Sequence, residues 1–458
     1  MKRLVLALSL FATGCTVGPD YKRPELTPSP EQFRFVTGPQ QAQSLADAPW
    51  FQVFGDAGLQ ALVREALANN LDLKVAMARV EEARARAGIA KSYYYPMVDG
   101  AVGYQARAAS NTGENDSTSQ SLSYGFKLSW EIDLFGKLRR QNESALALSL
   151  AAEQARRGVL VTLIGDVASS YFLLRELDLE LDIARKTLAI NDQTVAYFKN
   201  RLDGGVSNRL ELDRIISLRA DTASAIPELE RQAAQVENLA SFLVGRPPGP
   251  IQRSPLMMGE TLPPPIPAGL PTSLLERRPD VAQAEQALIS SNANIGAAKA
   301  LFFPAIGLTS FLGGVNGDLE SFLGTGAVWS AGAGLLQPVF QAGRLRRNVE
   351  VQQARFDAAF AEYQKAVLNG YREVANALVT IQKLAETRGQ QETGVAALQD
   401  AADLARARYD SGLASYIEIL TADQDLFSRQ LRLAQTRGAE LRARAELYRT
   451  LGGGWQQP

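Results

Sequence analysis

The hydrophobic pattern of the chain changes period from two residues to about three and a half, and this change occurs twice. Between residues 121 and 134, apolar and polar positions alternate strictly. The apolar positions are Leu122, Tyr124, Phe126, Leu128, Trp130, Ile132 and Leu134, and the positions between them are Ser121, Ser123, Gly125, Lys127, Ser129, Glu131 and Asp133. Such alternation predicts a strand with one apolar and one polar face. Together with shorter patterns of the same kind, it predicts strands near 97–108, 120–134, 304–314 and 326–340.

Long helices are predicted after each pair of strands. From Gly136 to Arg201 only single glycines at 158 and 165 interrupt the helical pattern, a run of roughly 100 Å at about 1.5 Å per residue. Heptad-spaced apolar positions, which predict packing seams, are Leu160, Ile164, Val167, Tyr171, Leu174, Leu181 and Leu188, and later Val349, Phe356, Phe360, Tyr363, Val367, Val374, Leu378 and Ile381. Helices return over 208–244 and 414–451. We therefore expect two helical hairpins, with glycine-containing turns at 203–207 and 410–414.

Three segments of the first half recur in the same order about 207 residues later, which indicates an internal duplication. KSYYYP at 91–96 matches KALFFP at 299–304, GKLRR at 136–140 matches GRLRR at 343–347, and RLDGGVSNRLEL at 201–212 matches RYDSGLASYIEI at 408–419. The prolines between 246 and 271 exclude a continuous helix there. The expected organisation is a first repeat over 56–245, a proline-rich linker over 246–271, a second repeat over 272–450 and a tail over 451–458.

The alternating strands have two explanations, a soluble sandwich with one face on a core and a membrane barrel. The strand near 120–134 exceeds the usual five or six residues and suits the roughly 9–11 residues of a tilted membrane strand. Aromatic residues gather near the strand ends, where the girdles of a barrel would lie, at Tyr93 to Tyr95, Phe302, Phe303 and Trp329. These features favour the barrel, whose polar face would line a water-filled lumen. The charged residues expected in that lumen are Asp99, Arg107, Lys127, Glu131 and Asp133.

Four strands cannot close a barrel, and an open strand edge in lipid leaves backbone groups unpaired at a cost of several kcal/mol each. Several chains must then share one barrel. Two chains would supply eight strands and leave an interior filled by side chains, whereas three would supply twelve and leave an aqueous lumen. Three chains are expected if the purpose of the barrel is transport.

The composition argues against enzymatic and nucleic-acid functions. The chain has 48 lysine and arginine residues against 49 acidic ones, so no overall charge draws it to nucleic acid. It has no histidine and a single cysteine, and so lacks the commonest zinc ligands and the usual proton shuttle of hydrolytic sites. The sequence contains no nucleophile–base spacing, phosphate-binding loop or metal-ligand cluster. We expect neither an enzyme nor a cofactor.

The first 14 residues have the features of a signal peptide: basic Lys2 and Arg3, an apolar stretch over 4–12 and a small-residue exit before Cys15. Cys15 stands where a bacterial lipoprotein is acylated, and a covalent lipid adds about 0.8 kcal/mol of membrane affinity per buried methylene. The alternative is a buried or free thiol beyond an ordinary cleavage site, because Ala12 replaces the leucine favoured there. The apolar stretch is shorter than the roughly 20 residues of a membrane-spanning helix, and we expect no better candidate later in the chain.

Four segments closely resemble the TolC-like outer-membrane efflux proteins of the lipoprotein OprM/NodT branch. They are CTVGPDYKRP at 15–24, SLSYGFKLSWEIDLFGKLRR at 121–140, LLERRPDVAQAEQAL at 274–288 and LYRTLGGGW at 447–455. The resemblance spans essentially the whole mature chain. It implies a mixed α+β membrane protein, in which a trimeric barrel with four strands per chain continues into a long periplasmic α-helical tunnel. The lipidated segment 15–55 would follow the periplasmic body, and the linker and the C-terminal tail would form a mixed equatorial region.

The resemblance also implies the function. Such proteins are passive exit ducts in the outer membrane for antimicrobials and other toxic small molecules. The implied partners are two further copies of the chain, a periplasmic adaptor, an inner-membrane transporter of the resistance-nodulation-division type, and outer-membrane lipid. In this family the tunnel closes at its periplasmic tip, just after the hairpin turns.

By the same resemblance, Glu418 corresponds to an acidic gate position, Ile417 to an apolar constriction and Tyr409 to a tyrosine that latches neighbouring helices. Thr421 stands where the family frequently has aspartate, which weakens the expectation of a double acidic ring. Further charge near the first turn is supplied by Glu211, Asp213 and Arg214. A ring of like carboxylates attracts cations and opposes tight closure. Glu418 also fits a simpler role as a solvated charge near a helix N-terminus.

Other functions have the same sequence features. The duct of a protein-secreting ABC exporter or of a metal-ion efflux system would share this architecture. A structural envelope lipoprotein, with a rod of heptads and no lumen, is an alternative of another class, against which the alternating strands argue. The cargo is not encoded in a wide conduit, because the inner-membrane transporter selects it.

Overall fold

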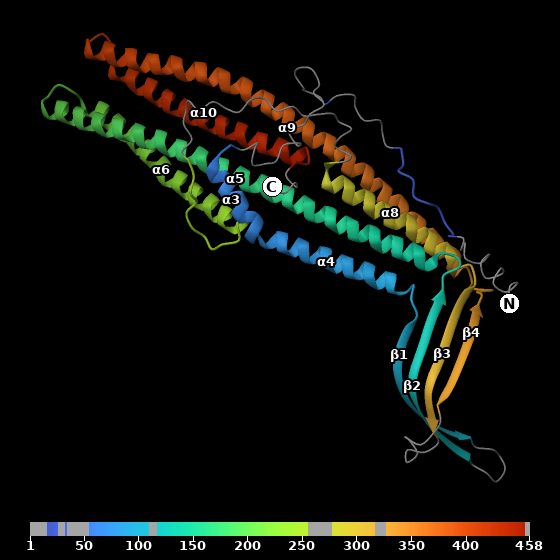
Figure 1. Cartoon of the computed structure of the whole chain (residues 1–458). Coiled ribbons are helices and arrows are strands. Elements are labelled where there is room, and N and C mark those ends of the chain that lie inside the picture. The colour runs from blue at the N-terminus through green and yellow to red at the C-terminus, as the bar shows by residue number, and fades with distance from the viewer. Residues whose placement is uncertain are drawn as a thin grey trace. The chain divides into compact units, whose positions relative to one another are not determined.

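The computed structural model describes residues 16–25, 33, 55–109, 117–254, 277–316 and 327–453. After α3 (Ala57–Asn69), the elements form two copies of one series (Figure 1). The first copy is α4 (Leu71–Ser92), β1 (Met97–Ala109), β2 (Ser117–Ile132), α5 (Lys137–Asp203) and α6 (Arg209–Leu243). The second is α8 (Pro279–Ala300), β3 (Ala305–Asn316), β4 (Val328–Leu336), α9 (Arg344–Asp410) and α10 (Tyr416–Thr450). The predicted duplication is confirmed, since α5 and α9 both have 67 residues and α6 and α10 both have 35.

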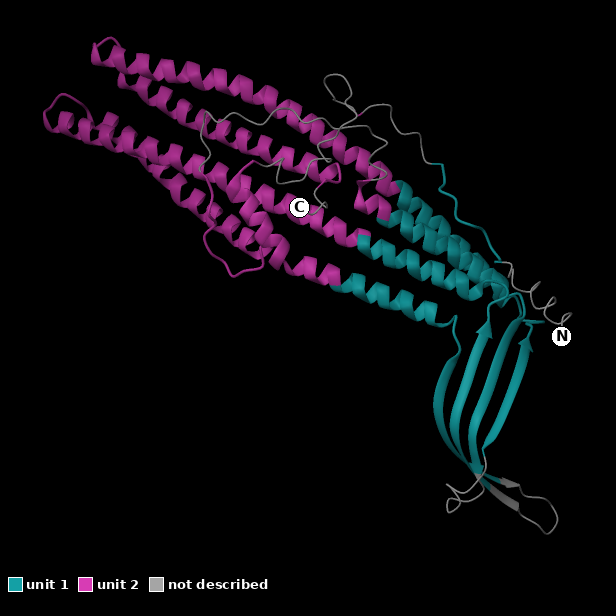
Figure 2. Ribbon diagram, in the orientation of Figure 1, with its two compact units in different colours: residues 1–26, 78–153, 283–364 teal, residues 27–77, 154–282, 365–458 magenta. Residues whose placement is uncertain are grey.

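The chain divides into two compact units (Figure 2). One comprises 1–26, 78–153 and 283–364 and contains the sheet; the other comprises 27–77, 154–282 and 365–458 and contains the turns of both helical hairpins. The predicted signal peptide, Cys15 and most of the linker and C-terminal tail lie outside the described residues.

The four strands form one antiparallel sheet in the order β1-β2-β3-β4, in which the β2–β3 pairing joins the two repeats. The register sets residues of one kind side by side. One row across the sheet contains Gly100, Phe126, Leu312 and Trp329, and the next row, on the opposite face, contains Asp99, Lys127, Phe311 and Ser330. The predicted division into an apolar and a polar face is confirmed, with Phe311 as an exception on the polar side.

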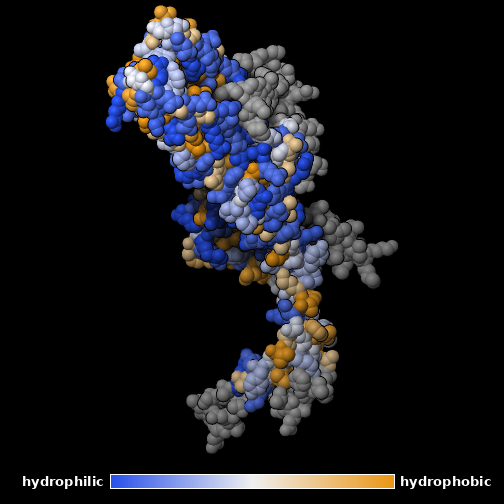
Figure 3. Space-filling model, turned by 90° about the vertical axis from the view of Figure 1, so that its left-hand side faces the viewer, coloured by the Kyte–Doolittle hydropathy of each residue, from blue (hydrophilic) through white to orange (hydrophobic). Residues whose placement is uncertain are grey.

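Large side chains of the apolar face are exposed. The exposed fraction is 76% for Val102, 74% for Trp329, 66% for Leu335 and 63% for Phe126. Figure 3 shows the corresponding apolar patches over the strands. A soluble sandwich would bury such a face against a core. The exposure of these side chains therefore favours the barrel over the sandwich.

The core of the unit that contains the hairpin turns is centred on α5. Tyr171 of α5 is fully buried, and its hydroxyl donates to Oδ1 of Asp56 at 2.7 Å. The same carboxylate caps α3, because it accepts the backbone N–H groups of Gly58 and Leu59. Arg175, one turn further along α5, donates to Asp56 Oδ2 at 3.1 Å. One acidic residue thus fixes the start of α3 against the centre of the core.

The expectation that no later segment approaches a membrane-spanning helix is wrong. Among the described residues, α5 contains an 18-residue stretch apolar enough to cross a membrane. Within the structure 61% of that stretch is buried. The sequence alone does not distinguish such a stretch from a membrane span, because a core helix packed on several sides is apolar all round.

Candidate channel wall and periplasmic tip

The turns of the two hairpins have the same construction. Gly205 and Gly412 have φ angles of +74° and +73°, which a side chain at Cβ would disfavour. Arg201 donates to the carbonyl of Val206 at 3.4 Å, and Arg408, its counterpart in the second repeat, donates to the carbonyl of Leu413 at 3.5 Å. The repeated sequence that begins at these arginines therefore encodes one turn twice.

Just behind the turns, aromatic side chains from both hairpins pack together. Phe198 of α5 is 1% exposed, and its ring centroid lies 4.1 Å from that of Tyr416 on α10 and 6.1 Å from that of Tyr409 on α9. The rings of Tyr409 and Tyr416 are 5.5 Å apart. Burial raises the pKa of both hydroxyls, so they stay protonated at neutral pH. We call Phe198, Tyr409 and Tyr416 the tip cluster.

Arg201 joins the tip cluster from α5. Its guanidinium lies 5.7 Å from the ring centroid of Tyr409, within the range of a cation–π interaction, and donates to the Tyr197 hydroxyl at 2.9 Å. Of these residues, only Tyr409 is among the gate residues predicted from the sequence. Phe198, Arg201 and Tyr416 were missed, although the recurrence of arginine at the head of both turn motifs was a signal for Arg201.

The remaining gate candidates of the second turn are on the surface of the chain. Glu418 is in the first turn of α10, and its Oε2 lies 3.7 Å from Nε of Arg408, with both side chains about half exposed. Ile417 is 49% exposed. The Thr421 hydroxyl donates to the carbonyl of Ile417 at 2.9 Å. All three side chains are accessible to a neighbouring molecule or to a lumen.

The candidates of the first turn have local partners. Asn208 accepts the backbone N–H of Glu211 at 3.0 Å, and the Ser207 hydroxyl donates to the Glu211 carboxylate at 2.8 Å, so Glu211 belongs to the N-terminal cap of α6. Asp213 lies 3.6 Å from Arg209 on an exposed helical surface. Arg214 is exposed.

The predicted lumen residues lie on or next to the polar face. Asp99 is directly opposite Lys127 in the register of β1 and β2, and Arg107 is opposite Ser119. Glu131 pairs with Lys137 at 2.6 Å. The placement of Asp133 in a strand is wrong, because β2 ends at Ile132.

Asp133 instead anchors the start of α5. Its carboxylate accepts the backbone N–H of Arg139 at 2.9 Å and lies 3.3 Å from the guanidinium Nε of the same residue. A negative charge at a helix N-terminus is favourable. Glu131 and Asp133 therefore fix the transition from strand β2 to helix α5.

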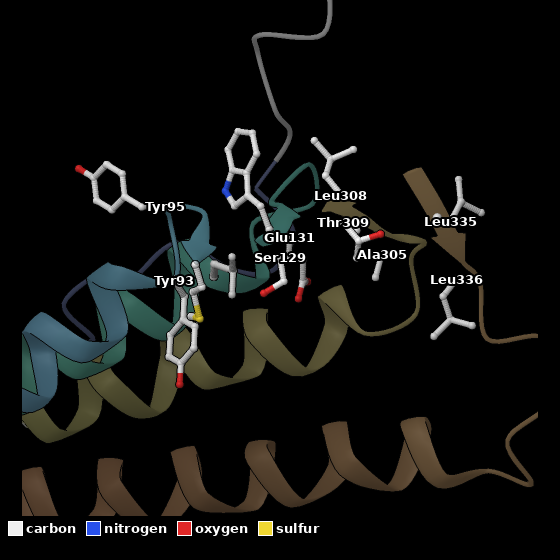
Figure 4. Close-up of a pocket in the computed structure, with 14 residues that line it drawn as sticks. Tyr93, Tyr95, Ser129, Glu131, Ala305, Leu308, Thr309, Leu335 and Leu336 are labelled. Carbon is white, nitrogen blue, oxygen red and sulfur yellow. The ribbon is translucent and has the colours of Figure 1, made fainter. Parts of the chain in front are cut away.

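At the α4 and α5 end of the sheet there is a hollow of about 570 Å³ (Figure 4). Its lining includes Tyr93, Tyr95, Trp130, Glu131, Leu308 and Leu335. Trp130 donates its indole N–H to the carbonyl of Tyr94 at 3.0 Å. The hollow is thus a largely aromatic and aliphatic surface at the end of the strands. Among the described residues, no group of three or more acidic, cysteine or histidine side chains is arranged to hold a metal ion.

Each repeat contributes two strands to a curved sheet with an exposed apolar face, and a long helical hairpin follows each pair of strands. This architecture defines a class of membrane channel. The family model described as outer membrane efflux protein matches the chain twice, over residues 62–245 and 270–453. The chain belongs to this family and is an outer-membrane efflux channel. The two matches coincide with the two structural repeats.

Relatives of known name match the chain along its whole length. The cation efflux system protein CusC of Escherichia coli is 34% identical over 460 residues, which cover 100% of this chain and 99% of that protein. The solvent efflux pump outer membrane protein SrpC of Pseudomonas putida is 34% identical over 99% of this chain and 98% of that protein. The solved structure of the outer-membrane channel OprN has a TM-score of 0.90 at 31% identity, covering 97% of this chain and all of that one. These relatives are transport proteins.

Proposed function

We propose that three copies of the chain close one twelve-stranded barrel in the outer membrane and one helical tunnel in the periplasm, a passive exit duct for toxic small molecules. The observation that carries this proposal is the sheet itself. Within the described residues, β1 pairs with β2 alone and β4 pairs with β3 alone, so both outer edges lack a partner. An unpaired edge is not tolerated in lipid. Pairing of β4 with β1 of another copy removes every edge only when the ring is complete.

The proposed duct has two walls. The apolar face, with Phe126, Leu312 and Trp329, would contact lipid. The polar face, with Asp99 and Lys127, would contact water. Twelve strands leave an aqueous lumen, whereas eight leave an interior filled by side chains.

The cargo we propose is a toxic small molecule or ion that an inner-membrane transporter delivers through a periplasmic adaptor. The names of the relatives support this class of cargo but do not identify one cargo within it, since one relative is named for cation efflux and another for solvent efflux. The tip segments 201–214 and 408–421 are where we propose that the adaptor docks. We further propose that Cys15 carries a lipid anchor; a relative 31% identical over 459 residues, SilC of Salmonella typhimurium, is named as a probable outer membrane lipoprotein.

The transport function is tested by deleting the gene and measuring intracellular accumulation of dyes, antimicrobials, solvents and metal ions. Accumulation that rises on deletion and falls on complementation supports efflux and identifies the cargo class. If nothing accumulates and the secreted proteome changes instead, the duct serves protein secretion. If neither changes and the purified protein conducts no current in a planar bilayer, the structural-lipoprotein alternative replaces the duct.

The barrel is tested by a matched pair of variants in β4, whose side chains are all exposed in the single chain. Ala331 is on the apolar face and Ser330 on the polar face. A lysine on a lipid face costs up to about 2–4 kcal/mol at mid-membrane, whereas one in a lumen does not. Ala331→Lys should therefore lower the amount of folded protein in the outer membrane, and Ser330→Lys should not. Equal effects would contradict the assignment of the two faces.

A further inference from the structure

The two repeats meet inside the chain at a seam that has three kinds of contact. Strand β2 pairs with β3. Phe135, which follows β2, stacks on Phe303, which precedes β3, with ring centroids 4.7 Å apart. Arg140 of α5 lies across Gly296 of α8, where a Cβ atom would come within 2.8 Å of the arginine Nε. The first repeat thus contributes β2 and residues that follow it, and the second repeat contributes β3 and residues that precede it.

The duplication supplies both sides of this seam a second time, on the outside of the chain. Phe340 is the aromatic residue before the GRLRR segment, but Gln341 and Ala342 separate it from that segment, whereas Phe135 directly precedes GKLRR. Tyr95 occupies the position in KSYYYP that Phe303 occupies in KALFFP. Arg347 corresponds to Arg140, and Gly88 to Gly296. The correspondences of Tyr95, Arg347 and Gly88 follow from the offset of about 207 residues between the repeats, whereas that of Phe340 requires a two-residue insertion in the second repeat.

In the single chain, the counterparts of the seam residues are all open to contact. Phe340 is 84% exposed and Tyr95 is 61% exposed. Figure 4 shows the Tyr95 ring pointing away from the other labelled side chains. The Arg347 side chain is 80% exposed, against 4% for Arg140. A Cβ atom at Gly88 would have no atom of the described residues around it within 4 Å. The residues of the inner seam are thus packed, whereas their counterparts in the other repeat are exposed in the single chain.

We propose that a second copy of this chain completes an equivalent seam, in which Phe340 stacks on Tyr95 of the partner subunit and Arg347 lies across Gly88 of the partner subunit. This inference rests on the proposed trimer and specifies its contacts. Pairing of β4 with the partner's β1 repeats the β2–β3 pairing and brings these residues together in the same order.

The glycine at position 88 supports the proposed seam. A glycine inside a helix is less favourable than alanine by about 1 kcal/mol. Among the described residues of the single chain, nothing lies within 4 Å of a Cβ atom placed on Gly88, so their packing does not require its lack of a side chain. In the inner seam, Gly296 has a reason to be glycine, because Arg140 occupies the space of a Cβ atom. The same reason applies to Gly88 when Arg347 of a neighbouring copy covers it.

The charges also match. Arg140 pairs with Glu143 at 2.8 Å, and Arg347 pairs with Glu350 at 2.6 Å, so each arginine has a carboxylate one helical turn away. Arg347 therefore takes a counter-charge with it when a partner buries it, which limits the cost of desolvation. Arg140 also donates to Asp20 at 2.7 Å. The described part of the chain holds no second copy of that N-terminal segment, so the seam between subunits should be weaker than the seam within the chain.

Cysteine cross-linking in the full-length, membrane-extracted protein tests the register. The pair Phe340→Cys with Tyr95→Cys should yield covalent dimers and trimers on a denaturing gel after mild oxidation. Each variant with one introduced cysteine beside Cys15 is the control, because a cysteine on one side of the seam has no introduced partner on the other side. The wild-type chain, with Cys15 alone, provides the background.

Variants at two open helical glycines test the packing. Gly88→Leu places a side chain where Arg347 of the partner subunit should lie, so the trimer should dissociate about tenfold or more readily at fixed concentration. Gly389→Leu is the matched control, since a Cβ atom there also has none of the structurally described residues within 4 Å. The first-repeat counterpart of Gly389 is Asp182, whose side chain is 52% exposed. Trimer stability should then be unchanged by Gly389→Leu.

The outcomes separate this inference from the proposed function. If the wild-type protein is a trimer by mass, but the cysteine pair does not cross-link and Gly88→Leu dissociates like the wild type, the proposed seam is overturned and the trimer stands. If the wild-type protein is monomeric in the membrane extract, the trimer itself is overturned.

Discussion

Asn70 and Arg278 each donate a hydrogen bond to the last residue of the return helix of their own repeat. Nδ2 of Asn70 donates to the carbonyl of Leu243 at 2.8 Å, and Nη1 of Arg278 donates to the carbonyl of Thr450 at 2.7 Å. Both donors directly precede the short helix that leads to a strand pair, α4 or α8. Equivalent residues therefore close the two repeats. The residue is Asn70, a neutral amide, in the first repeat and Arg278, a buried cation, in the second.

This difference predicts unequal costs of truncation. Arg278 is 6% exposed and pairs with Asp280 at 2.7 Å and with Glu373 at 2.8 Å. Arg278→Ala removes the buried cation from Glu373 and from the half-exposed Asp280 and should cost about 3 kcal/mol, the lower end of the range for a buried ion pair. Asn70→Ala removes its closing hydrogen bond and the N-terminal cap of α4, in which Asn70 Oδ1 accepts the backbone N–H of Leu73 at 2.8 Å, and should cost about 1–2 kcal/mol. Thermal unfolding followed by helical circular dichroism in detergent measures both.

The control for this comparison is Lys186→Ala, which removes an exposed lysine paired with Asp182 on the same helix. Such a pair contributes little. If Arg278→Ala shifts the unfolding temperature no more than Lys186→Ala does, the buried cation has no closing role.

A second prediction concerns the contact between Arg201 and Tyr409. It joins α5 to α9, so its loss should loosen the tip cluster. A cation–π contact at a partly exposed site contributes about 0.5–1 kcal/mol, equivalent to about two- to five-fold in the ratio of closed to open channels. Tyr409→Ala should raise the conductance in a planar bilayer by that factor, whereas Tyr409→Phe, which keeps the ring, should stay near the wild type. Equal effects of the two variants would show that the hydroxyl, rather than the ring, holds the helices.

The strands and hairpins could be predicted from the sequence because their signals are local. Alternation over 120–134 placed β2 within three residues of its start at Ser117 and two of its end at Ile132. The duplicated turn motif fixed both hairpin ends, and the positive φ angles of Gly205 and Gly412 agree with the glycines chosen there. Periodicity and turn chemistry depend only on neighbours in the chain.

The tip cluster and the closing hydrogen bonds could not be predicted in this way. Phe198 and Tyr416 lie more than two hundred positions apart, and neither belongs to a pattern that indicates contact. The burial of Arg140 depends on the N-terminal segment around Asp20, which sequence periodicity does not place. Asp133 is predicted in the strand because the alternation of apolar and polar residues continues past the last residue of β2. In the structure its carboxylate accepts a backbone N–H in the first turn of α5.

A third prediction tests Glu418 as a gate charge. If three copies of Glu418 face the tunnel axis, Glu418→Ala removes negative charge from a narrow passage and should lower the preference for cations over anions in a bilayer. If Glu418 is only a helix-end charge held near Arg408, the variant should lose about 0.3–1 kcal/mol of stability with unchanged currents. Glu228→Gln is the control, because Glu228 is an exposed acid of α6 far along the chain from either turn, paired with Arg231 on its own helix.

The last prediction concerns Glu176, a carboxylate buried between α5 and α10. It is 5% exposed, Arg442 donates to it, and a Cβ atom at Gly438 would overlap it. Burial, opposed by Arg442, raises the pKa of Glu176 to about 7. The folded state therefore keeps this proton at pH values where the unfolded chain has lost it. The stability that depends on Glu176 should be fully present below the unfolded pKa of about 4.5 and should be lost as the pH rises through about 7.

Glu176→Gln should remove this dependence, because glutamine does not titrate. Between about pH 5 and pH 8 the wild type should lose roughly 1–3 kcal/mol more stability than the variant, as measured by unfolding temperature at each pH. Glu228→Gln is the matched control. The pKa of Glu228 is lowered to about 2 by hydrogen bonds from Arg231, so both its folded and unfolded values lie below this window and its removal should leave the slope unchanged. If Glu176→Gln also leaves the slope unchanged, the buried carboxylate titrates as an exposed one does, and the raised pKa of Glu176 is contradicted.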